Sequence, residues 1–510
     1  MRAAPRRPAG LSVHALTAPA YVGVAALTGV AAGLRFYGLA RQGFWFDEGN
    51  TVLLVHFSPG RMLGLIPQSE STPPLYYLVA WVWARCFGFG EAGLRSLSAL
   101  AGALVVPIAY GAAAKLVSRR AGIIAAALTA CSPLLIWYSQ EARSYEVMVL
   151  LTGVALLAFA YALHSSSARI LAAWALASVL ALATHYYGLL AILPEAIWLL
   201  HVHGRRRSAQ LAVGGVALCA VALIPLAISQ SSTGNSNWIA SVSLLTRLRQ
   251  IAPLFLIGTG APAQGVLEPL AAALAVAALT LLGWRGRAGE RSGALLAGGL
   301  ATAGLVVSLL LVAAGVDELI ARNLIALWLP ATVLVAGGLA VRRAGAVGIA
   351  ITIGLCVIGV TASVGVAADP SLQRPDWRPV ARALGPLPAG SPGRAILVQR
   401  YLDLLPLSLY VPHLHFLGRA GARVDQLVVI SIRSPPRSFC WWGAACNLIP
   451  SEMQRAYPVA GFHVVSRERV EQFTILRLES ARPLRLRPPA VAAALTATDL
   501  RHDGLLIQRP

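Results

Sequence analysis

The strongest constraint on this chain is a series of long apolar runs separated by short polar segments. A helix needs about 20 apolar residues to cross a bilayer, and eleven runs come close to that length. They cover residues 18–39, 92–116, 121–138, 145–164, 169–184, 188–203, 209–229, 264–284, 292–315, 322–341 and 345–367. With 57% hydrophobic and 12% charged residues, the composition excludes an ordinary soluble protein. We therefore predict a polytopic α-helical membrane protein.

The basic residues are distributed as in a membrane protein. The formal net charge is +21, from 42 Lys and Arg against 21 Asp and Glu. These residues are not gathered on one soluble module, as binding to nucleic acid would require, so no nucleic-acid partner is predicted. Most of them lie between apolar runs, as expected for loops on the cytoplasmic side. The clusters are at residues 2–7, 115–120, 205–207, 285–291 and 342–343.

One further apolar segment, residues 73–90, decides the topology. It is short, contains Arg85 and is rich in Tyr and Trp, which favour the membrane interface. If it crosses the membrane, the cluster at 115–120 falls on the side opposite to the N-terminus. If it lies along the surface, all five clusters become cytoplasmic. We therefore predict a juxtamembrane helix here and a cytoplasmic N-terminus. The first apolar run is long enough to cross the membrane and no convincing small-residue cleavage site follows it, so we predict an uncleaved first helix. The long outer loop at 230–264 has the spacing of a second surface helix.

Residues 368–510 differ from the apolar domain at 1–367, because they are more polar and richer in proline. Strand-like runs such as RAILVQ, QLVVISI and FTILRL alternate with helical pieces such as DWRPVARAL. This pattern predicts a small extracytoplasmic α/β domain. Of six cysteines, only Cys440 and Cys446 share a polar stretch. Their spacing is compatible with a disulfide and equally with two free thiols.

Charged residues at the outer boundary need an explanation, because lipid makes a charge costly unless it faces water, a cation or a reacting group. Asp47 and Glu48 follow the first apolar run almost directly. Arg143 and Arg322 each stand beside acids at the start of a predicted span, where the positive-inside rule does not account for them. Two interpretations remain open. Acids stabilise a helix N-terminus and an arginine closes a helix end, or the arginines bind a lipid phosphate.

The order of the polar motifs carries a resemblance to a known family. The motifs are WFDE (45–48), TPPLYY (72–77), SPLLIWYSQEARSY (132–145), THYYG (184–188), ARNLIALWLP (321–330) and DWRPVARAL (376–384). In this order they resemble the bacterial branch of the GT-C glycosyltransferases related to the protein O-mannosyltransferases. The aminoarabinose transferase and the oligosaccharyltransferase catalytic subunit are more distant relatives. The resemblance extends over about residues 18–367, and it carries little information about the sugar.

The resemblance implies an enzyme of the cell membrane that takes a sugar from a polyprenyl-phosphate donor. The acceptor would be an extracytoplasmic hydroxyl of a glycan, a glycolipid or a protein, which attacks the anomeric carbon of the sugar in line and inverts its configuration. Asp47 matches the general base that removes the acceptor proton. Arg322 is the first candidate for stabilising the leaving phosphate, and Arg143 is the second.

The remaining candidate residues have less defined roles. The resemblance implies that Glu48 and Glu141 orient a sugar or hold a divalent cation, and that His185 donates to the phosphate or joins such a cation site. The first loop lacks a DxD motif, so we do not predict a metal. Tyr76 and Tyr186 are candidates for stacking on sugar rings, although interfacial aromatic residues are more often membrane anchors.

Two other classes of function fit a chain with many spans. A transporter or flippase of a lipid-linked or anionic solute is the first alternative, but no duplicated half is visible in the sequence. A structural assembly subunit is the second. The sequence identifies neither the sugar, the acceptor nor the oligomeric state.

Overall fold

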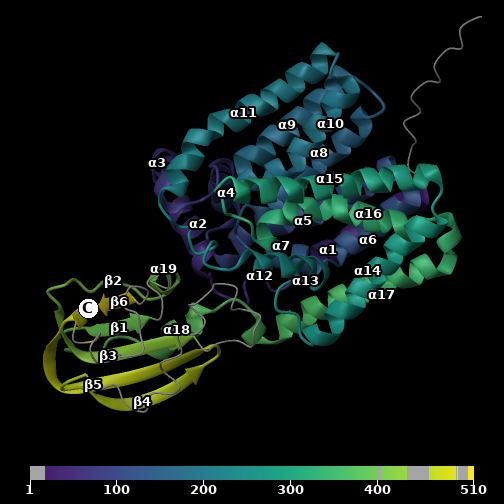
Figure 1. The fold of residues 1–510 in the computed structure, drawn as a ribbon. Helices are drawn as coiled ribbons and strands as arrows, with labels where there is room; N and C mark the ends of the chain where they lie inside the picture. The colour runs from purple at the N-terminus through teal and green to yellow at the C-terminus, as the bar shows by residue number, and fades with distance from the viewer. Residues whose placement is uncertain (1–17, 399–403, 433–458, 490, 492–503) are drawn as a thin grey trace, which may run out of the picture.

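In the computed structural model the described residues are 18–398, 404–432, 459–489, 491 and 504–510. The basic cluster at 2–7 and the pair Cys440 and Cys446 lie outside them. Helices occupy all eleven predicted spans (Figure 1). They are α1 (Ala18–Phe36), α5 (Glu91–Leu116), α6 (Arg119–Ala130), α7 (Pro133–Ser139), α8 (Tyr145–Ala162), α9 (Ala168–Thr184), α10 (Leu189–His203), α11 (Arg207–Ser231), α14 (Gln264–Arg285), α15 (Ala288–Ala313), α16 (Trp328–Ala340) and α17 (Gly345–Ala368).

Fewer helices are long enough to cross a membrane than the number of helical runs suggests. In the described part of the chain, seven helices are long and apolar enough to cross a membrane, or eight if α6 and α7 form one bent span. These two helices meet at 54°, where Ser132 caps α7 and Pro133 begins it. A proline fits the first turn of a helix but interrupts a helix that precedes it. The eleven predicted spans are therefore confirmed as helices, and a count of eleven crossings is not.

The segment between α1 and α5 folds as three short helices at one end of the bundle. They are α2 (Phe46–His56), α3 (Pro59–Ser69) and α4 (Leu75–Phe87). At 13 residues, α4 is about 20 Å long, which is shorter than the hydrocarbon core of about 30 Å. Arg95 in the first turns of α5 donates to the carbonyl oxygen of Leu39 just after α1, at 2.7 Å. Both ends of this segment therefore lie on the same side of the bundle.

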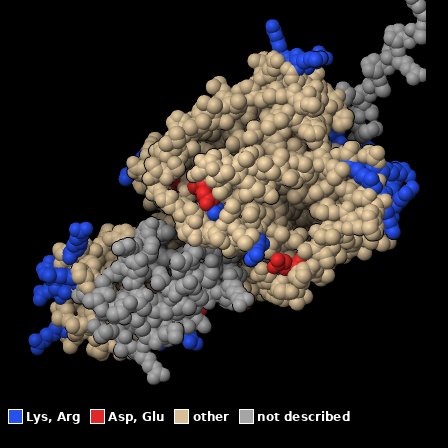
Figure 2. All heavy atoms as spheres, in the orientation of Figure 1, with Lys and Arg blue, Asp and Glu red and all other residues tan. Residues whose placement is uncertain are grey.

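The outer loop that was predicted to hold a second surface helix contains two short helices, α12 (Leu244–Arg249) and α13 (Ile251–Ile257). The basic loops meet at the other end of the bundle. Arg120 donates to the carbonyl oxygen of Gly345 at 2.8 Å, and Arg285 donates to that of Arg343 at 3.0 Å. Figure 2 shows Lys and Arg side chains gathered at the end of the helices opposite to the sheet. Short 3-10 turns complete the helical part: η1 (Tyr186–Gly188), η2 (Ala321–Leu327), η3 (Arg342–Ala344) and η4 (Pro370–Leu372).

The chain after α17 forms a six-stranded sheet with the order β2-β6-β1-β3-β5-β4. Its elements are α18 (Trp377–Leu384), β1 (Arg394–Val398), α19 (Leu404–Ser408), β2 (Leu414–Phe416), β3 (Ala422–Ile432), β4 (His463–Val470), β5 (Phe473–Leu486) and β6 (Gly504–Gln508). β1 and β3 are parallel, and the other neighbours are antiparallel. The predicted strands and the predicted helix at DWRPVARAL are confirmed. A shared apolar cluster contains Trp377 of α18 and Ile475 of β5, so α18 packs on one face of the sheet.

Candidate active site

The first turn of α2 positions the two acids that follow α1. Glu48 is the third residue of the helix, and its side chain accepts from the backbone N–H of Trp45 at 3.4 Å, as in a capping box. Acids in a first turn also interact favourably with the helix dipole. Both carboxylates therefore have a local reason to sit here. Their side chains nevertheless have different partners, which separates their roles.

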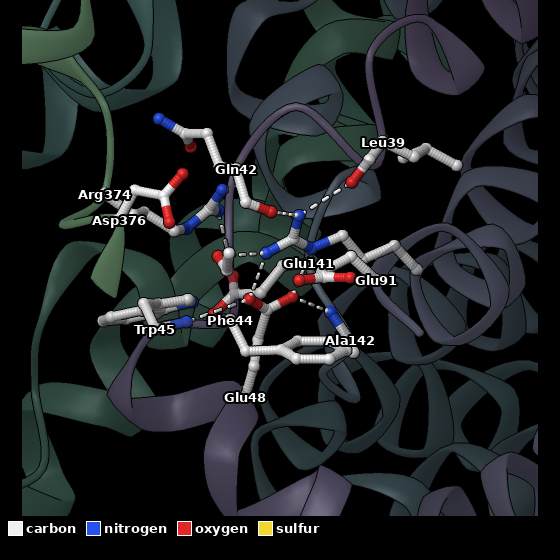
Figure 3. A network of polar contacts seen from close by, with 12 residues as sticks. Leu39, Gln42, Phe44, Trp45, Glu48, Glu91, Glu141, Ala142, Arg374 and Asp376 are labelled. Carbon is white, nitrogen blue, oxygen red and sulfur yellow. Dashed lines mark hydrogen bonds and ion pairs between the residues drawn. The ribbon is translucent and has the colours of Figure 1, made fainter. Parts of the chain in front are cut away.

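Glu48 is fully buried and bound on both oxygens (Figure 3). Arg95 donates to its two carboxylate oxygens at 2.7 and 2.6 Å, and the backbone N–H of Ala142 donates at 2.8 Å. Burial raises the pKa of Glu48, but the charges of Arg95 and Arg374 and the hydrogen bonds from Arg95 and Ala142 together outweigh burial and lower it. Arg95 also donates to the carbonyl oxygens of Gln42 and Gly43. Glu48 and Arg95 together fix the loop that leads into α2.

Asp47 lies against an arginine that is 275 residues away in the sequence. The Arg322 guanidinium donates to the Asp47 carboxylate at 3.1 Å. Arg322 belongs to η2, which precedes α16, and its guanidinium carbon lies 5.8 Å from the ring centre of Trp238. The Asp47 side chain is 11% exposed and that of Arg322 is 21% exposed. Both side chains of this pair therefore keep some contact with solvent.

Arg143 holds the backbone of Asp47 by a hydrogen bond. It lies in the turn between α7 and α8, and one of its terminal nitrogens donates to the carbonyl oxygen of Asp47 at 3.1 Å. The same nitrogen donates to the Glu70 carboxylate at 3.0 Å. Burial raises the pKa of Glu70 in spite of this partner. Arg143 thus connects the α7–α8 turn to α2 and to the end of α3.

Glu141 pairs with an arginine from the segment that leads into the sheet domain. Arg374 donates to the Glu141 carboxylate at 3.3 Å, and its guanidinium carbon lies 3.9 Å from the ring centre of Trp137. Burial raises the pKa of Glu141 to about 7; Arg374 opposes this shift, while the charges of Asp47 and Glu48 add to it. Glu141 is thus close enough to both acids for their charges to act on it. Near neutral pH it exists in both protonation forms.

The sheet domain also holds the loop before α2. The Tyr410 hydroxyl accepts from the backbone N–H of Phe44 at 2.6 Å and donates to the Glu91 carboxylate at 2.8 Å. Gly43 lies so close to this contact that an added Cβ would meet an Asp376 oxygen at 2.5 Å and the Tyr410 hydroxyl at 2.9 Å. A side chain at position 43 would push the domain away from the loop.

His185 is buried at the end of α9, with its ring centre 5.2 Å from that of Tyr145. Burial, together with the charges of Arg143 and Arg322, lowers the pKa of His185 to about 3. The imidazole is therefore neutral at physiological pH. Its Nδ1 accepts from the backbone N–H of Tyr187 at 3.3 Å, which assigns the proton to Nε2. Nε2 is the atom that can donate to a ligand.

The two tyrosines predicted to stack on sugars each have a contact within the protein, and their stacking on a sugar stays a prediction. Tyr76 is buried in an apolar cluster and packs edge-on against Tyr77 at 5.4 Å. The Tyr186 hydroxyl donates to the side chain of Gln230 at 2.7 Å. Within the described ranges, no group of three or more His, Cys, Asp and Glu side chains has the arrangement of a metal site.

Three residues of this site were not anticipated from the sequence: Arg95, Arg374 and Glu70. Arg95 sits just inside a predicted span, which is the same signal that singled out Arg143. Arg374 precedes the DWRPVARAL motif by two residues. Glu70 had no visible signal, because its neighbours along the chain form an ordinary polar turn.

Comparisons with known proteins agree with this architecture. Residues 71–229 match a family model described as dolichyl-phosphate-mannose-protein mannosyltransferase. That range contains Glu141, Arg143 and His185, and it excludes Asp47 and Arg322. A comparison with curated proteins gives no match.

Two solved structures of ArnT from Cupriavidus metallidurans share the fold. The apo structure has a TM-score of 0.55 and the structure bound to undecaprenyl phosphate has a TM-score of 0.51. Each is 16% identical to this chain over 90% of this chain and 98% of ArnT. The chain therefore has the fold of ArnT, and its residues 71–229 are similar to the family of dolichyl-phosphate-mannose-protein mannosyltransferases.

Proposed function

We propose that the chain transfers a sugar from a polyprenyl-phosphate donor to an acceptor hydroxyl on the outer side of the cell membrane, with inversion. One observation carries the choice of reacting groups. Four ion pairs converge around the start of α2, and they differ in exposure. The side chains of Arg95 and Glu48 are 4 and 0% exposed, those of Arg374 and Glu141 are 5 and 1% exposed, and those of Arg143 and Glu70 are 11 and 2% exposed. In the pair Asp47 and Arg322, by contrast, both side chains are more than 10% exposed.

The Asp47–Arg322 pair has the two charges that the reaction needs. Asp47 supplies a carboxylate that removes the acceptor proton as the hydroxyl oxygen attacks the anomeric carbon. The bond from that carbon to the phosphate oxygen breaks, and the polyprenyl phosphate departs. Arg322 stabilises the charge on the departing phosphate through its planar donors. A bound donor phosphate would replace Asp47 as the partner of Arg322, and the carboxylate would then be available as a base.

The other charged residues position these two. Glu48 and Arg95 fix the loop before α2, and Arg143 holds the backbone of Asp47. We assign these three to positioning, because Glu48 and Arg95 are buried against each other and Arg143 is held by Glu70 and the backbone of Asp47. Glu141 and neutral His185 remain candidates for hydrogen bonds to the donor sugar or phosphate, since one titrates near neutral pH and the other presents an Nε2 proton.

The donor class follows from two comparisons. ArnT was solved bound to undecaprenyl phosphate, and the matching family model is named for a dolichyl-phosphate-mannose donor. Mannose is therefore the first sugar to test. A transporter gains no support from either comparison. Transporters usually bind their substrate near the membrane midplane. The pair of Asp47 with the partly buried Arg322 lies instead at one end of the bundle.

The membrane orientation is part of the proposal. Because Arg95 reaches the end of α1, the segment with α2, α3 and α4 begins and ends on the same side. The basic loops lie at the opposite end and would be cytoplasmic by the positive-inside rule. A reporter fused after Gly90 is expected to read as external. A cytoplasmic reading would show that the proposed orientation is wrong and that the site faces the cytoplasm.

The test of the activity is a transfer assay on purified protein in liposomes, with a panel of polyprenyl-phosphate sugars and acceptors from the cell envelope. We expect transfer with one donor, and loss of transfer in Asp47→Asn and in Arg322→Ala while both variants remain folded. Full turnover in both variants would show that the reacting groups are wrongly assigned. Unchanged movement of a lipid-linked solute in the absence of any transfer would favour the transporter.

A further inference from the structure

The sheet domain carries a cluster of arginines at the end that points away from the helices. All of them are exposed, and they come from the turn before β3, the two strands β3 and β5, and the C-terminus. They are Arg419, Arg423, Arg482, Arg485, Arg487 and Arg509. We refer to this surface as the arginine end of the sheet. Figure 2 shows the same gathering of basic side chains at the edge of the domain farthest from the helices.

Two of these arginines are placed directly opposite each other. In the antiparallel pairing of β3 with β5, Arg423 faces Arg485. Like charges at directly opposed positions destabilise a sheet. The Arg485 Nε donates to the carbonyl oxygen of Ala420 at 3.0 Å, which accounts for one donor and leaves the charge uncompensated by that contact. The repulsion between these two arginines destabilises the protein when no ligand is bound. An anion bound between the two guanidinium groups would turn this repulsion into attraction.

The backbone shapes a hollow beside this pair. A shallow cavity of about 320 Å³ is lined by Arg423, Arg485 and Arg509, together with Pro392, Gly421 and Ala422. Gly421 has φ +72°, and an added Cβ would collide with the carbonyl oxygen of Leu486. The turn before β3 can therefore approach β5 only with glycine at this position. Three arginines from separate elements consequently line one hollow.

The arginine end is far from the candidate active site. At its start, β5 follows Gln472, whose side chain donates to the carbonyl oxygen of Gln373 at 2.9 Å, next to Arg374. From there β5 runs to Leu486, and a strand of that length spans roughly 40 Å. Charges separated by more than about 8 Å of solvent are largely screened at physiological salt. The arginines therefore do not act electrostatically on Asp47 or Arg322, and their concentration needs a separate explanation.

We propose that the arginine end binds a polysaccharide that carries carboxylate or phosphate groups. The planar donors of arginine suit both anions. Several arginines along one edge suit a repeating polyanion better than a single small anion. A membrane surface fits less well, because this edge faces away from the helices that would enter the bilayer.

A protein partner also fits less well. Protein interfaces usually have an apolar centre. On the described part of the sheet domain, the exposed large hydrophobic residues are Phe416, Val464 and Val465. They lie on β2 and β4, outside the arginine end. The proposal goes beyond the sugar transfer and does not depend on it.

The test measures binding of polygalacturonate to the full-length protein in neutral-lipid nanodiscs, with uncharged dextran as a comparison. We expect polygalacturonate to bind, dextran not to bind, and the affinity to fall steeply as salt is added. The variant with Arg423→Ala and Arg485→Ala is expected to lose affinity roughly tenfold, because it removes two of the three guanidinium groups in the hollow. Its thermal midpoint should not fall, since a like-charge pair is removed.

A matched control removes two exposed arginines of β4 from the same domain, with Arg467→Ala and Arg469→Ala. It should keep the affinity of the unmodified protein. Equal losses in the two double variants would show only a general charge effect and would overturn the proposal. Binding to vesicles of phosphatidylglycerol that depends on Arg423 and Arg485, without binding of polygalacturonate, would overturn it in favour of a membrane.

Discussion

Asp47→Asn is the substitution that separates catalysis from folding most cleanly. Asparagine has nearly the same shape, still accepts a hydrogen bond from Arg322, and is well tolerated near the start of a helix. It removes only the negative charge and the ability to take a proton. A positioned general base contributes about 10²- to 10⁴-fold to a rate, which corresponds to about 3–5 kcal/mol of activation free energy. We therefore expect turnover to fall by at least roughly a hundredfold.

The effect on stability should be smaller. A hydrogen bond to a charged group contributes about 1.5–3 kcal/mol to stability, and Asn keeps a neutral version of the contact. The partners Asp47 and Arg322 are also 11 and 21% exposed, so solvent reduces the cost further. The thermal midpoint should therefore change little while activity is lost. The assay compares sugar transfer per folded molecule with the unfolding midpoint in the same detergent.

The sheet domain offers a matched control in Asp376→Asn. Asp376 also sits at a helix start, where it caps α18, and it pairs with Arg378 at 2.9 Å. Asparagine keeps this cap, and the site lies outside the proposed reacting groups, so transfer should stay within roughly twofold of the unmodified protein. If Asp376→Asn reduced transfer as much as Asp47→Asn, the loss would reflect charge removal near the domain boundary. If Asp47→Asn kept full turnover, the general-base assignment would be wrong.

Three further changes test the neighbouring groups. Arg322→Lys keeps a charge but loses the planar donors, so transfer should fall roughly 10- to 100-fold; turnover equal to the unmodified protein would argue against a bidentate phosphate contact. Glu48→Gln leaves Arg95 without a buried counter-charge and should lower the unfolding free energy by about 3 kcal/mol. Turnover per folded molecule should change little. A loss of activity without a loss of stability would instead place Glu48 among the reacting groups. The raised pKa of Glu141, about 7 against an ordinary 4.5, means that the folded protein holds this proton more tightly than the unfolded chain. Stability should therefore decline between about pH 4.5 and pH 7, by about 3 kcal/mol, and then level off. Thermal melts across this range should show the decline in the unmodified protein and its absence in Glu141→Gln, and identical pH profiles would contradict the assignment.

The helices and the sheet were predictable because their signals are local. Runs of apolar residues mark α5 or α17 without reference to any other part of the chain, and the strand pattern of QLVVISI marks β3. The break between α6 and α7 also had a local signal, Pro133. A count of consecutive apolar residues runs through this proline, so it does not reveal the break. The sequence cannot show how strongly the two helices bend, because the angle depends on packing against their neighbours.

The pairing of the charged residues was predictable only in part. The motifs identified Asp47 and Arg322 separately, and the family resemblance assigned them to one site. Nothing in the local sequence distinguishes Asp47 from Glu48. In the structure, however, Asp47 pairs with Arg322, and Glu48 is buried against Arg95. That difference arises from the rotation of α2 and from the position of α5. The contact of Arg374 with Glu141 likewise depends on how the sheet domain docks, which no periodicity in the sequence records.

The central claim is that Asp47 and Arg322, which are far apart in sequence, hold the reacting ends of acceptor and donor at one outer boundary of the membrane. The most direct measurement is a cryo-EM structure of the full-length protein with bound undecaprenyl phosphate. The phosphate is expected within hydrogen-bond distance of the Arg322 guanidinium, with the Asp47 carboxylate no longer paired with Arg322. Phosphate density bound at the basic loops of the opposite end, or Arg322 still paired with Asp47 and without contact to the phosphate, would contradict the claim.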